Sequence, residues 1–143
     1  MQKVHKNRRS RLEENFEYLL NDLNIDYKYE DKKLIYIIPE SQHTYLIDWS
    51  LPNNIYIETK GYLSDHKERS KYILIKQQYP NIDLRFIFEN PNKLCGGTKY
   101  THEVWAIKNG FKYCGIKDIE TIKEWLQNDS INKRKKAKVI DET

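Results

Sequence analysis

The stretch HTYLIDWSLPNNIYIETKG, at residues 43–61, decides the fold, because it contains two β-strand patterns separated by a turn signal. Residues 44–51 and residues 55–60 are both rich in aromatic and β-branched side chains, which favour strands. The segment PNN between them is typical of a turn, and Gly61 ends the second strand pattern. We therefore predict an antiparallel hairpin with a short loop over residues 52–54.

The loop length fixes which side chains face each other across the predicted hairpin. If Leu51 pairs with Ile55, Asp48 stands directly opposite Glu58. Side chains alternate along a strand, so Lys60 lies on the same face as Glu58. The sequence therefore predicts two carboxylates and an ammonium group in one cluster, and a register shift of one residue would remove it.

This cluster has two interpretations. Facing like charges destabilise a sheet, and burial among apolar neighbours raises that cost, which a bound Mg²⁺ ion would offset. Asp48 and Glu58 would then be metal ligands, and Lys60 would orient or deprotonate a water molecule or stabilise charge on a phosphate. The alternative is an ordinary cross-strand patch in which Lys60 neutralises one acid on a solvated face.

The residues before the hairpin predict an amphipathic helix from residue 10 to about residue 24, because leucine and phenylalanine recur on one face. Of its glutamates, Glu13 alone is expected to border the buried face, where it is a candidate third acidic ligand. Ser10 offers an equal alternative, a capping box in which the Glu13 side chain bonds the Ser10 backbone. The periodicity leaves both roles of Glu13 open.

The rest of the chain alternates between strand and helix patterns. Strands are expected at residues 34–38 and 82–89, helices at 64–79, 102–109 and 119–126, and connections at 25–33 and 90–100. This order predicts the α/β class, with a small mixed β-sheet flanked by helices. We expect a basic arm over residues 1–11, a folded domain over 12–127 and a basic, disordered tail over 128–143.

Composition limits the classes of function. The chain has 143 residues and no apolar run near the roughly 20 residues that a bilayer span needs, which excludes a membrane protein. Two cysteines and the lack of an apolar leader indicate an intracellular protein. Cys95 and Cys114 are expected to pack as small hydrophobic side chains, since their spacing with His102 matches no metal motif.

Basic residues gather at the ends of the chain. The first eleven residues hold Lys3, Lys6, Arg8, Arg9 and Arg11 without an acid, and five further Lys or Arg follow residue 128. Such arms suit the phosphate backbone of nucleic acid, to which binding is salt-sensitive. The alternative is that both arms are merely solvated.

The sequence resembles the phage endonuclease I family of Holliday-junction resolvases, within the PD-(D/E)xK nuclease superfamily. The resemblance covers RSRLEE at residues 9–14, YIIPESQHTY at 36–45, the hairpin stretch at 43–61 and SDHKERSKYILIKQQYPNIDLRFIF at 64–88. It implies a restriction-endonuclease-like fold and an intertwined, domain-swapped homodimer. Residues 36–44 would be the bridging strand through which the two subunits exchange parts.

The same resemblance implies an activity, that of a phage nuclease of DNA recombination. It would recognise four-way DNA junctions by shape and nick opposing strands, in the cytoplasm of a bacterial host or phage-infected cell. Asp48, Glu58 and Lys60 match the family's catalytic trio, and Glu13 matches an additional acid that would complete the site of the other subunit. Two divalent ions per active site, Mg²⁺ or Mn²⁺, are implied.

Two other functions stay open at this stage. A related nuclease acting on mismatched, branched or plain duplex DNA, or on transposon ends, would use the same residues. A non-enzymatic DNA-binding module with basic arms would be indifferent to Mg²⁺. His43 is expected to have a structural role, and the resemblance assigns nothing to Cys95, His102 or the C-terminal tail.

Overall fold

The computed structural model describes residues 10–38 and 41–128, and this part of the chain is built on a five-stranded mixed sheet. The strands β1 to β3 pair antiparallel, whereas β3, β4 and β5 run parallel, and the spatial order follows the chain order. Their bounds are Lys28–Ile38 (β1), Ser41–Ser50 (β2), Ile55–Lys60 (β3), Asp83–Phe88 (β4) and Tyr113–Gly115 (β5).

Four α-helices and one π-helical turn accompany the sheet in the described residues. Each α-helix begins where a Ser, Thr or Asp side chain accepts a hydrogen bond from the first turn, which satisfies a backbone N–H that the helix leaves free. The helices are Arg11–Asp22 (α1), His66–Gln78 (α2), His102–Lys108 (α3) and Ile119–Lys123 (α4), and the turn Glu124–Asn128 (η1) continues α4.

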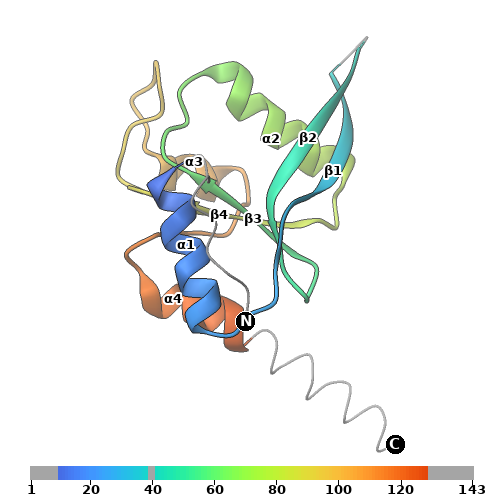
Figure 1. The fold of residues 1–143 in the computed structure, drawn as a ribbon. Helices are drawn as coiled ribbons and strands as arrows, with labels where there is room; N and C mark the ends of the chain where they lie inside the picture. Colours follow the sequence, from blue (N-terminus) through green and yellow to red (C-terminus); the bar gives the residue numbers. More distant parts are fainter. Residues whose placement is uncertain (1–9, 39–40, 129–143) are drawn as a thin grey trace, which may run out of the picture.

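Helices cover both faces of the sheet, so the domain has three layers (Figure 1). On one face, Phe86 and Phe88 of β4 pack with side chains of α2 and α3. On the other face, Ile57 and Ile87 pack with side chains of α1, α4 and η1. The hairpin of β1 and β2 extends from this body beside α2 (Figure 1).

The predicted hairpin register is confirmed. Trp49 pairs with Ile57 and Ser50 with Tyr56, and the backbone N–H of Leu51 donates to the carbonyl of Ile55 at 2.9 Å. Asn54 closes the loop with φ of 60°, a left-handed conformation that asparagine tolerates better than most residues. Asp48 and Glu58 are therefore the next facing positions.

Two expectations about the sheet were wrong. Residues 25–33 are not simply a connection, because β1 begins at Lys28 and pairs with the whole of β2, with an irregularity between Tyr29 and Lys32. The aromatic ring of Tyr29 packs against Trp49 at 4.7 Å, an anchor that local propensity does not reveal. β5 was missed, because three residues form a strand only where β4 offers a parallel partner.

The other expected elements are present, including α2 from its Asp65 cap to Tyr79 and the loop that follows β4. The predicted mixed α/β class is thus confirmed for the described residues. None of the helices in that part of the chain is sufficiently long and apolar to span a bilayer.

Candidate active site

Asp48 lies on β2, directly beyond the last pair that joins β2 to β3. Its Oδ2 atom accepts hydrogen bonds from the backbone N–H of Thr59 at 3.1 Å and from the Thr59 hydroxyl at 3.0 Å. The Trp49 indole N–H donates to the same hydroxyl at 3.3 Å. These contacts fix the carboxylate of Asp48 against the neighbouring strand.

Glu58 is buried, with 5% of its surface exposed, so the solvated cross-strand patch does not describe this site. Its Oε1 atom accepts a hydrogen bond from the hydroxyl of Tyr45, which is also buried. The ring of Tyr72 from α2 lies edge-on to Tyr45 at 5.7 Å, and Lys71 lies 4.7 Å from the Tyr72 ring. The Glu58 carboxylate therefore lies beside the aromatic side chains of Tyr45 and Tyr72, with the ammonium group of Lys71 nearby.

Lys60 is shared between two carboxylates. Its Nζ atom lies 3.8 Å from Oε2 of Glu58 and 2.5 Å from Oε1 of Glu68, which stands in the first turn of α2. Burial lowers the pKa of Lys60, but the negative charges of Glu58 and Glu68 outweigh that effect and the pKa is raised. The ammonium group stays protonated and is held at the site.

The electrostatics of the carboxylate pair favour a bound cation. Burial and the charge of Glu58 raise the pKa of Asp48 to about 8, although the hydrogen bonds from Thr59 act in the opposite direction. Burial also raises the pKa of Glu58, against the effect of Lys60. A buried and a half-buried carboxylate that resist ionisation next to each other are a donor set that fits a hard ion such as Mg²⁺ or Mn²⁺.

Glu13 lies on α1 and is buried, with 6% of its surface exposed. The Ser10 hydroxyl accepts from the Glu13 backbone N–H at 3.1 Å, so the first half of the capping box is present. The Glu13 carboxylate accepts a hydrogen bond from the Tyr29 hydroxyl. Burial first, and then this bond, raise the pKa of Tyr29, and the charge of Asp48 adds to the effect. Tyr29 thus ties α1 to β1.

The prediction that Glu13 alone borders the buried face of α1 was wrong. Glu17, one turn later, is completely buried, and its carboxylate accepts a hydrogen bond from the Tyr27 hydroxyl at 2.7 Å. The apolar side chains set the direction of the face correctly, but the segment that leads into β1 brings Tyr27 over the helix and so widens the covered part of the helix surface.

No group of three or more His, Cys, Asp or Glu side chains in the described residues is placed to hold a metal ion. Asp48 and Glu58 come together, whereas Glu13 does not join them as a third ligand within one chain. Cys95 and Cys114 are buried in different hydrophobic clusters, which confirms that they pack as small hydrophobic side chains.

His102 has a structural position at the start of α3. It is completely buried, and its Nε2 accepts from the backbone N–H of Leu63 at 3.1 Å, which ties α3 to the segment after β3. Burial and the charges of Lys93 and Arg69 lower the pKa of His102 to about 4, so the ring is neutral. This neutral ring is what accepts the hydrogen bond.

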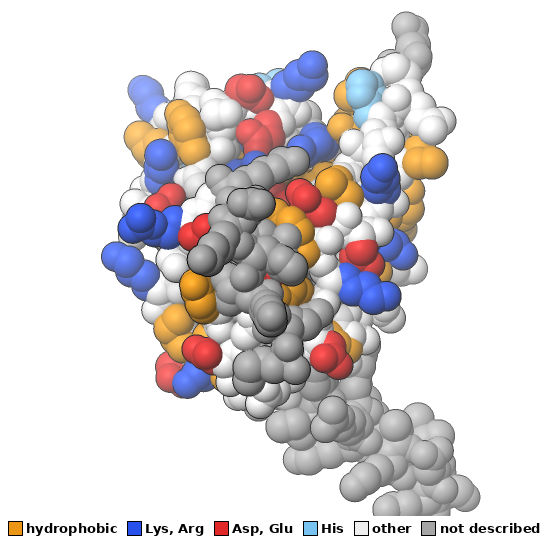
Figure 2. Space-filling model, viewed as in Figure 1, with side chains coloured by type: hydrophobic (Ala, Val, Ile, Leu, Met, Phe, Trp, Pro, Cys, Tyr) orange, Lys and Arg blue, Asp and Glu red, His pale blue; other side chains and the backbone are white. Residues whose placement is uncertain are grey.

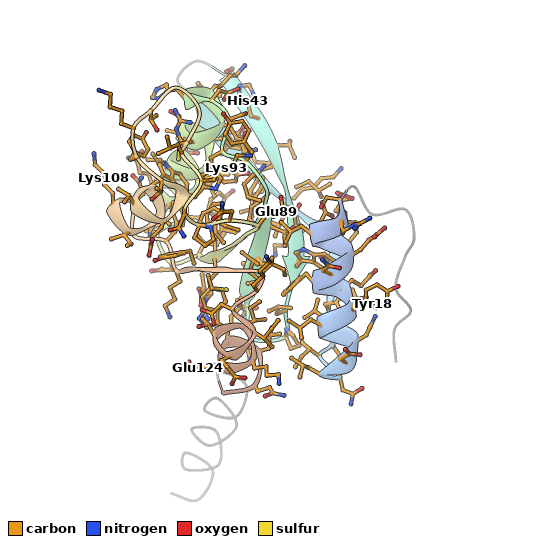
Figure 3. The ribbon with its side chains drawn as sticks, turned by 90° about the vertical axis from the view of Figure 1, so that its left-hand side faces the viewer. Tyr18, His43, Glu89, Lys93, Lys108 and Glu124 are labelled. Atoms are coloured by element: carbon orange, nitrogen blue, oxygen red, sulfur yellow. The ribbon has the colours of Figure 1, made fainter. Side chains whose placement is uncertain are left out.

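Most of the predicted DNA-binding arm lies outside the described residues, namely Lys3, Lys6, Arg8 and Arg9, and so does the tail beyond Asn128. Arg11 is described and is exposed at the first position of α1. His43 lies toward the far end of the hairpin, where its ring contacts Ser41 and Tyr36, consistent with a structural role (Figure 3).

Sequence reasoning missed the partners of the candidate trio Asp48, Glu58 and Lys60. Lys60 contacts Glu68, Glu58 contacts Tyr45, and Asp48 contacts Thr59. A signal existed for Tyr45 and Thr59, because both flank the trio in the same two strands. None existed for Glu68, since its position depends on how α2 crosses the sheet.

Comparison with known proteins gives a family and two relatives of this chain. The family model described as Phage endonuclease I matches residues 1–140 of the chain. "Endonuclease I" of Escherichia phage T7 is 39% identical over 106 residues, which cover 73% of this chain and 70% of that protein. "Endodeoxyribonuclease 1" of Enterobacteria phage T3 is 40% identical over 106 residues, covering 73% and 69%.

Proposed function

The chain belongs to the phage endonuclease I family of nucleases, and from this we propose that it is a structure-selective endodeoxyribonuclease that resolves four-way DNA junctions. It would nick opposing strands near the branch point in the cytoplasm of a bacterial host or phage-infected cell. The proposal also includes a restriction-endonuclease-like fold and a homodimer. One observation carries the chemistry, the half-buried Asp48 facing the buried Glu58 beside Lys60.

In the proposed reaction, a phosphodiester is hydrolysed: water oxygen bonds to phosphorus, the bond to one bridging oxygen breaks, and that oxygen leaves with a proton. Asp48 and Glu58 would hold divalent metal, Mg²⁺ or Mn²⁺ and two ions per site, together with Glu13. When bound, such ions supply an activated water and neutralise charge on the phosphate. Thr59 and Tyr45 hold the two carboxylates in place through the hydrogen bonds described above.

Lys60 would act on the phosphate or on the attacking water. Its pKa is raised, so the side chain is a cation that orients and stabilises rather than a base that takes a proton. Its contact with Glu68 holds the Nζ atom near the Glu58 carboxylate, but at 3.8 Å from Glu58 compared with 2.5 Å from Glu68. The side chain keeps 22% exposure, which leaves room for substrate contact.

Two nicks require two active sites, which a homodimer supplies. In this structure β1 pairs with β2 from Lys28–Ser50 to Ile38–Ser41, and only residues 39–40 join the two strands. The same pairs would form between two chains if the bridge at residues 36–44 passed from one subunit to the other. Glu13, which lies before β1, would then complete the site that contains the other chain's Asp48.

The basic residues of the N-terminal arm, Lys3, Lys6, Arg8, Arg9 and Arg11, would clamp the junction backbone. On the face shown in Figure 2, Lys and Arg side chains stand mainly around the margin, while Asp and Glu also occur nearer its middle. Such an arrangement suits a phosphate backbone that approaches a metal-binding centre, and it favours recognition by shape.

The test is incubation of the purified protein with an immobile four-way junction and with its matched linear duplex, each with Mg²⁺ and with EDTA, read on a denaturing gel. Paired, Mg²⁺-dependent nicks near the branch point and none in the duplex are expected. Asp48→Asn, Glu58→Gln and Lys60→Ala should each abolish nicking while junction binding survives. Equal nicking of both substrates would remove the junction selectivity, and binding without any product would leave a DNA-binding module.

A further inference from the structure

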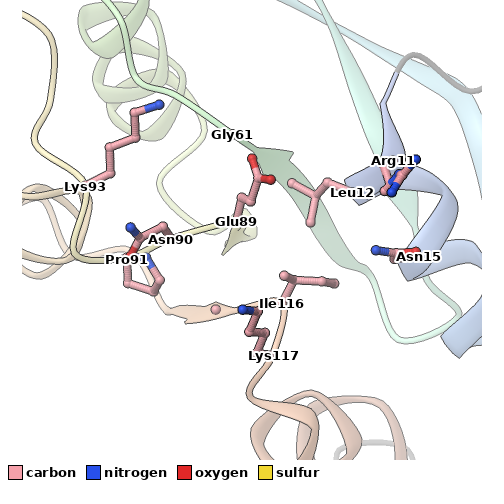
Figure 4. A pocket seen from close by; sticks show the side chains of 11 residues that line it. Arg11, Leu12, Asn15, Gly61, Glu89, Asn90, Pro91, Lys93, Ile116 and Lys117 are labelled. Atoms are coloured by element: carbon pink, nitrogen blue, oxygen red, sulfur yellow. The ribbon is translucent and has the colours of Figure 1, made fainter.

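A pocket of about 710 Å³ lies between the start of α1 and the ends of the parallel strands (Figure 4). Arg11, Leu12 and Asn15 of α1 form one wall. Its floor includes the ends of the three parallel strands. Gly61 directly follows β3, Glu89 directly follows β4, and Gly115 is the last residue of β5. Ligands of open α/β sheets bind outside the carboxyl ends of parallel strands, which is where this pocket opens.

Two residues that line the pocket are chain neighbours of candidate site residues. Gly61 follows Lys60, and Leu12 precedes Glu13. The floor is tied to the site by a hydrogen bond from the backbone N–H of Glu89 to the carbonyl of Lys60 at 3.2 Å. A group bound in the pocket would therefore lie beside, and not on, the reacting centre.

The lining combines hydrogen-bond donors and cations with apolar surface. Arg11, Lys93 and Lys117 are exposed cations that line the pocket from three different segments, and two asparagines add amide donors. Lys93 also lies over the ring of Tyr62, with Nζ 4.2 Å from the ring centroid. Positive charge and donors suit an oxyanion, and the apolar side chains of Leu12 and Ile116 suit a sugar ring.

We propose that this pocket binds the phosphodiester backbone of the cleaved DNA strand, next to the scissile phosphate, through Arg11, Lys93 and Lys117. The proposal rests on the proposed nuclease function and adds a subsite to it. Its volume lies within the roughly 300–1,000 Å³ of pockets that hold small ligands, so the pocket accommodates a nucleotide unit and not a duplex.

Glu89 is a carboxylate among these cations. Its side chain reaches toward Gly61, where a Cβ atom would lie 3.3 Å from its Oε2 atom (Figure 4). None of the ion pairs found within the described residues involves Glu89. A phosphate in the pocket would be repelled by this charge, so Glu89 would limit how tightly the strand is held and favour its release.

The test is junction binding by the full chain in EDTA, measured by fluorescence anisotropy over a series of salt concentrations. The double variant Lys93→Gln/Lys117→Gln should bind about tenfold more weakly, and its slope of log K against log salt should be shallower by about 2, since each phosphate contact contributes about 0.9. Glu89→Gln should bind severalfold more tightly. Lys108→Gln, at an exposed lysine of α3 at a distance from the pocket (Figure 3), removes one positive charge outside the pocket; this control should bind as wild type.

The outcomes separate the pocket from the nuclease. Unchanged affinity and slope in the double variant overturn the pocket, even if wild type nicks junctions in Mg²⁺. The expected losses in a wild-type protein that nicks no DNA in Mg²⁺ or Mn²⁺ keep the pocket and overturn the nuclease. Weaker binding of Glu89→Gln would contradict the repulsion assigned to Glu89. An equal loss of affinity in Lys108→Gln would show that the effect comes from net charge and not from the pocket.

Discussion

The ionisation of Asp48 links the candidate site to the stability of the domain. Its carboxyl group has an ordinary pKa of 3.8 and a pKa of about 8 in the folded chain, because burial and Glu58 oppose the charge. The folded state therefore binds more protons than the unfolded state between these values. The folded domain therefore loses stability progressively as the pH rises from about 4 to about 8, because Asp48 has to ionise in surroundings that oppose its charge.

We predict that the metal-free protein becomes less stable between pH 6.5 and pH 8, by at most about 1.4 kcal/mol per pH unit for Asp48. His102 does not obscure this window, because its pKa is lowered to about 4 and its contribution ends near its ordinary value of 6.5. Thermal unfolding in EDTA checks the prediction. Asp48→Asn should flatten the dependence of stability on pH. In the wild-type protein, Mg²⁺ should restore the stability that is lost at the higher pH. An unchanged slope in Asp48→Asn would assign the pH dependence to another group.

Glu68 is the second residue with a specific expectation, because it holds Lys60 at 2.5 Å. Glu68→Gln should lower the rate of junction nicking about 10- to 100-fold, the usual effect of removing a group that orients a catalytic side chain. Junction affinity should stay unchanged, since the effect is on Lys60 and not on the arm. Single-turnover nicking and anisotropy measure the two quantities.

The control for this experiment is Glu124→Gln, an exposed glutamate at the other end of the domain (Figure 3). It carries the same loss of charge and should nick at the wild-type rate. A Glu68→Gln rate equal to that of the control would show that Lys60 is positioned without Glu68.

At the scale of elements, two acid–tyrosine contacts hold α1 against β1 and against the residue directly before it. Glu17 and Glu13 accept from the hydroxyl groups of Tyr27 and Tyr29, one turn apart on the helix. Phe16 and Leu20 fill the space between α1 and the sheet, where Phe16 contacts Trp49 at 5.2 Å. The apolar contacts supply the attraction, and the tyrosines decide how the helix is rotated.

Tyr27→Phe tests this arrangement. Removing the hydroxyl takes a hydrogen bond from the buried carboxylate of Glu17, which should destabilise the domain by about 1–3 kcal/mol. Tyr18→Phe is the matched control on α1, because Tyr18 is 56% exposed, and it should change stability by less than about 0.5 kcal/mol. Urea unfolding of the two variants gives the comparison, and equal midpoints would mean that the Glu17 contact adds nothing.

At the scale of the whole molecule, the question is which chain supplies Glu13 to the site of Asp48. A swapped homodimer brings together Glu13 of one subunit and Asp48 of the other, and a closed monomer keeps both on one chain. The structure pairs β1 with β2 over an unusually long ladder whose joining residues are few, which either arrangement satisfies.

A heterodimer of Glu13→Gln and Asp48→Asn chains distinguishes the two arrangements. If Glu13 acts in the partner's site, one site of the heterodimer carries both substitutions and the other carries none, so nicking of one strand returns. If Glu13 serves its own chain, each site carries one substitution and no nicking returns. Co-expression with two affinity tags yields the heterodimer, and both homodimers, expected to be inactive, are the controls.

Local geometry explains what the sequence by itself determined about this protein. The length of the loop after Leu51 sets the register, and strand alternation places Glu58 and Lys60 on one face, so the facing of Asp48 and Glu58 follows from neighbours in the chain. Caps and apolar periodicity likewise located α1 and α2 to within a few residues. The short strand β5 was not predicted, because its three residues are too few to show a strand pattern.

Tertiary packing alone decided the contacts made between elements distant in the sequence. Glu68 reaches Lys60 because α2 crosses that end of β3, and Glu17 is buried because the segment before β1 brings Tyr27 over α1. The pocket arises where α1 meets three strand ends that no local pattern aligns. Helix rotation and crossing are set by side-chain packing across the whole core, and that information is not contained in the period or spacing of any one segment.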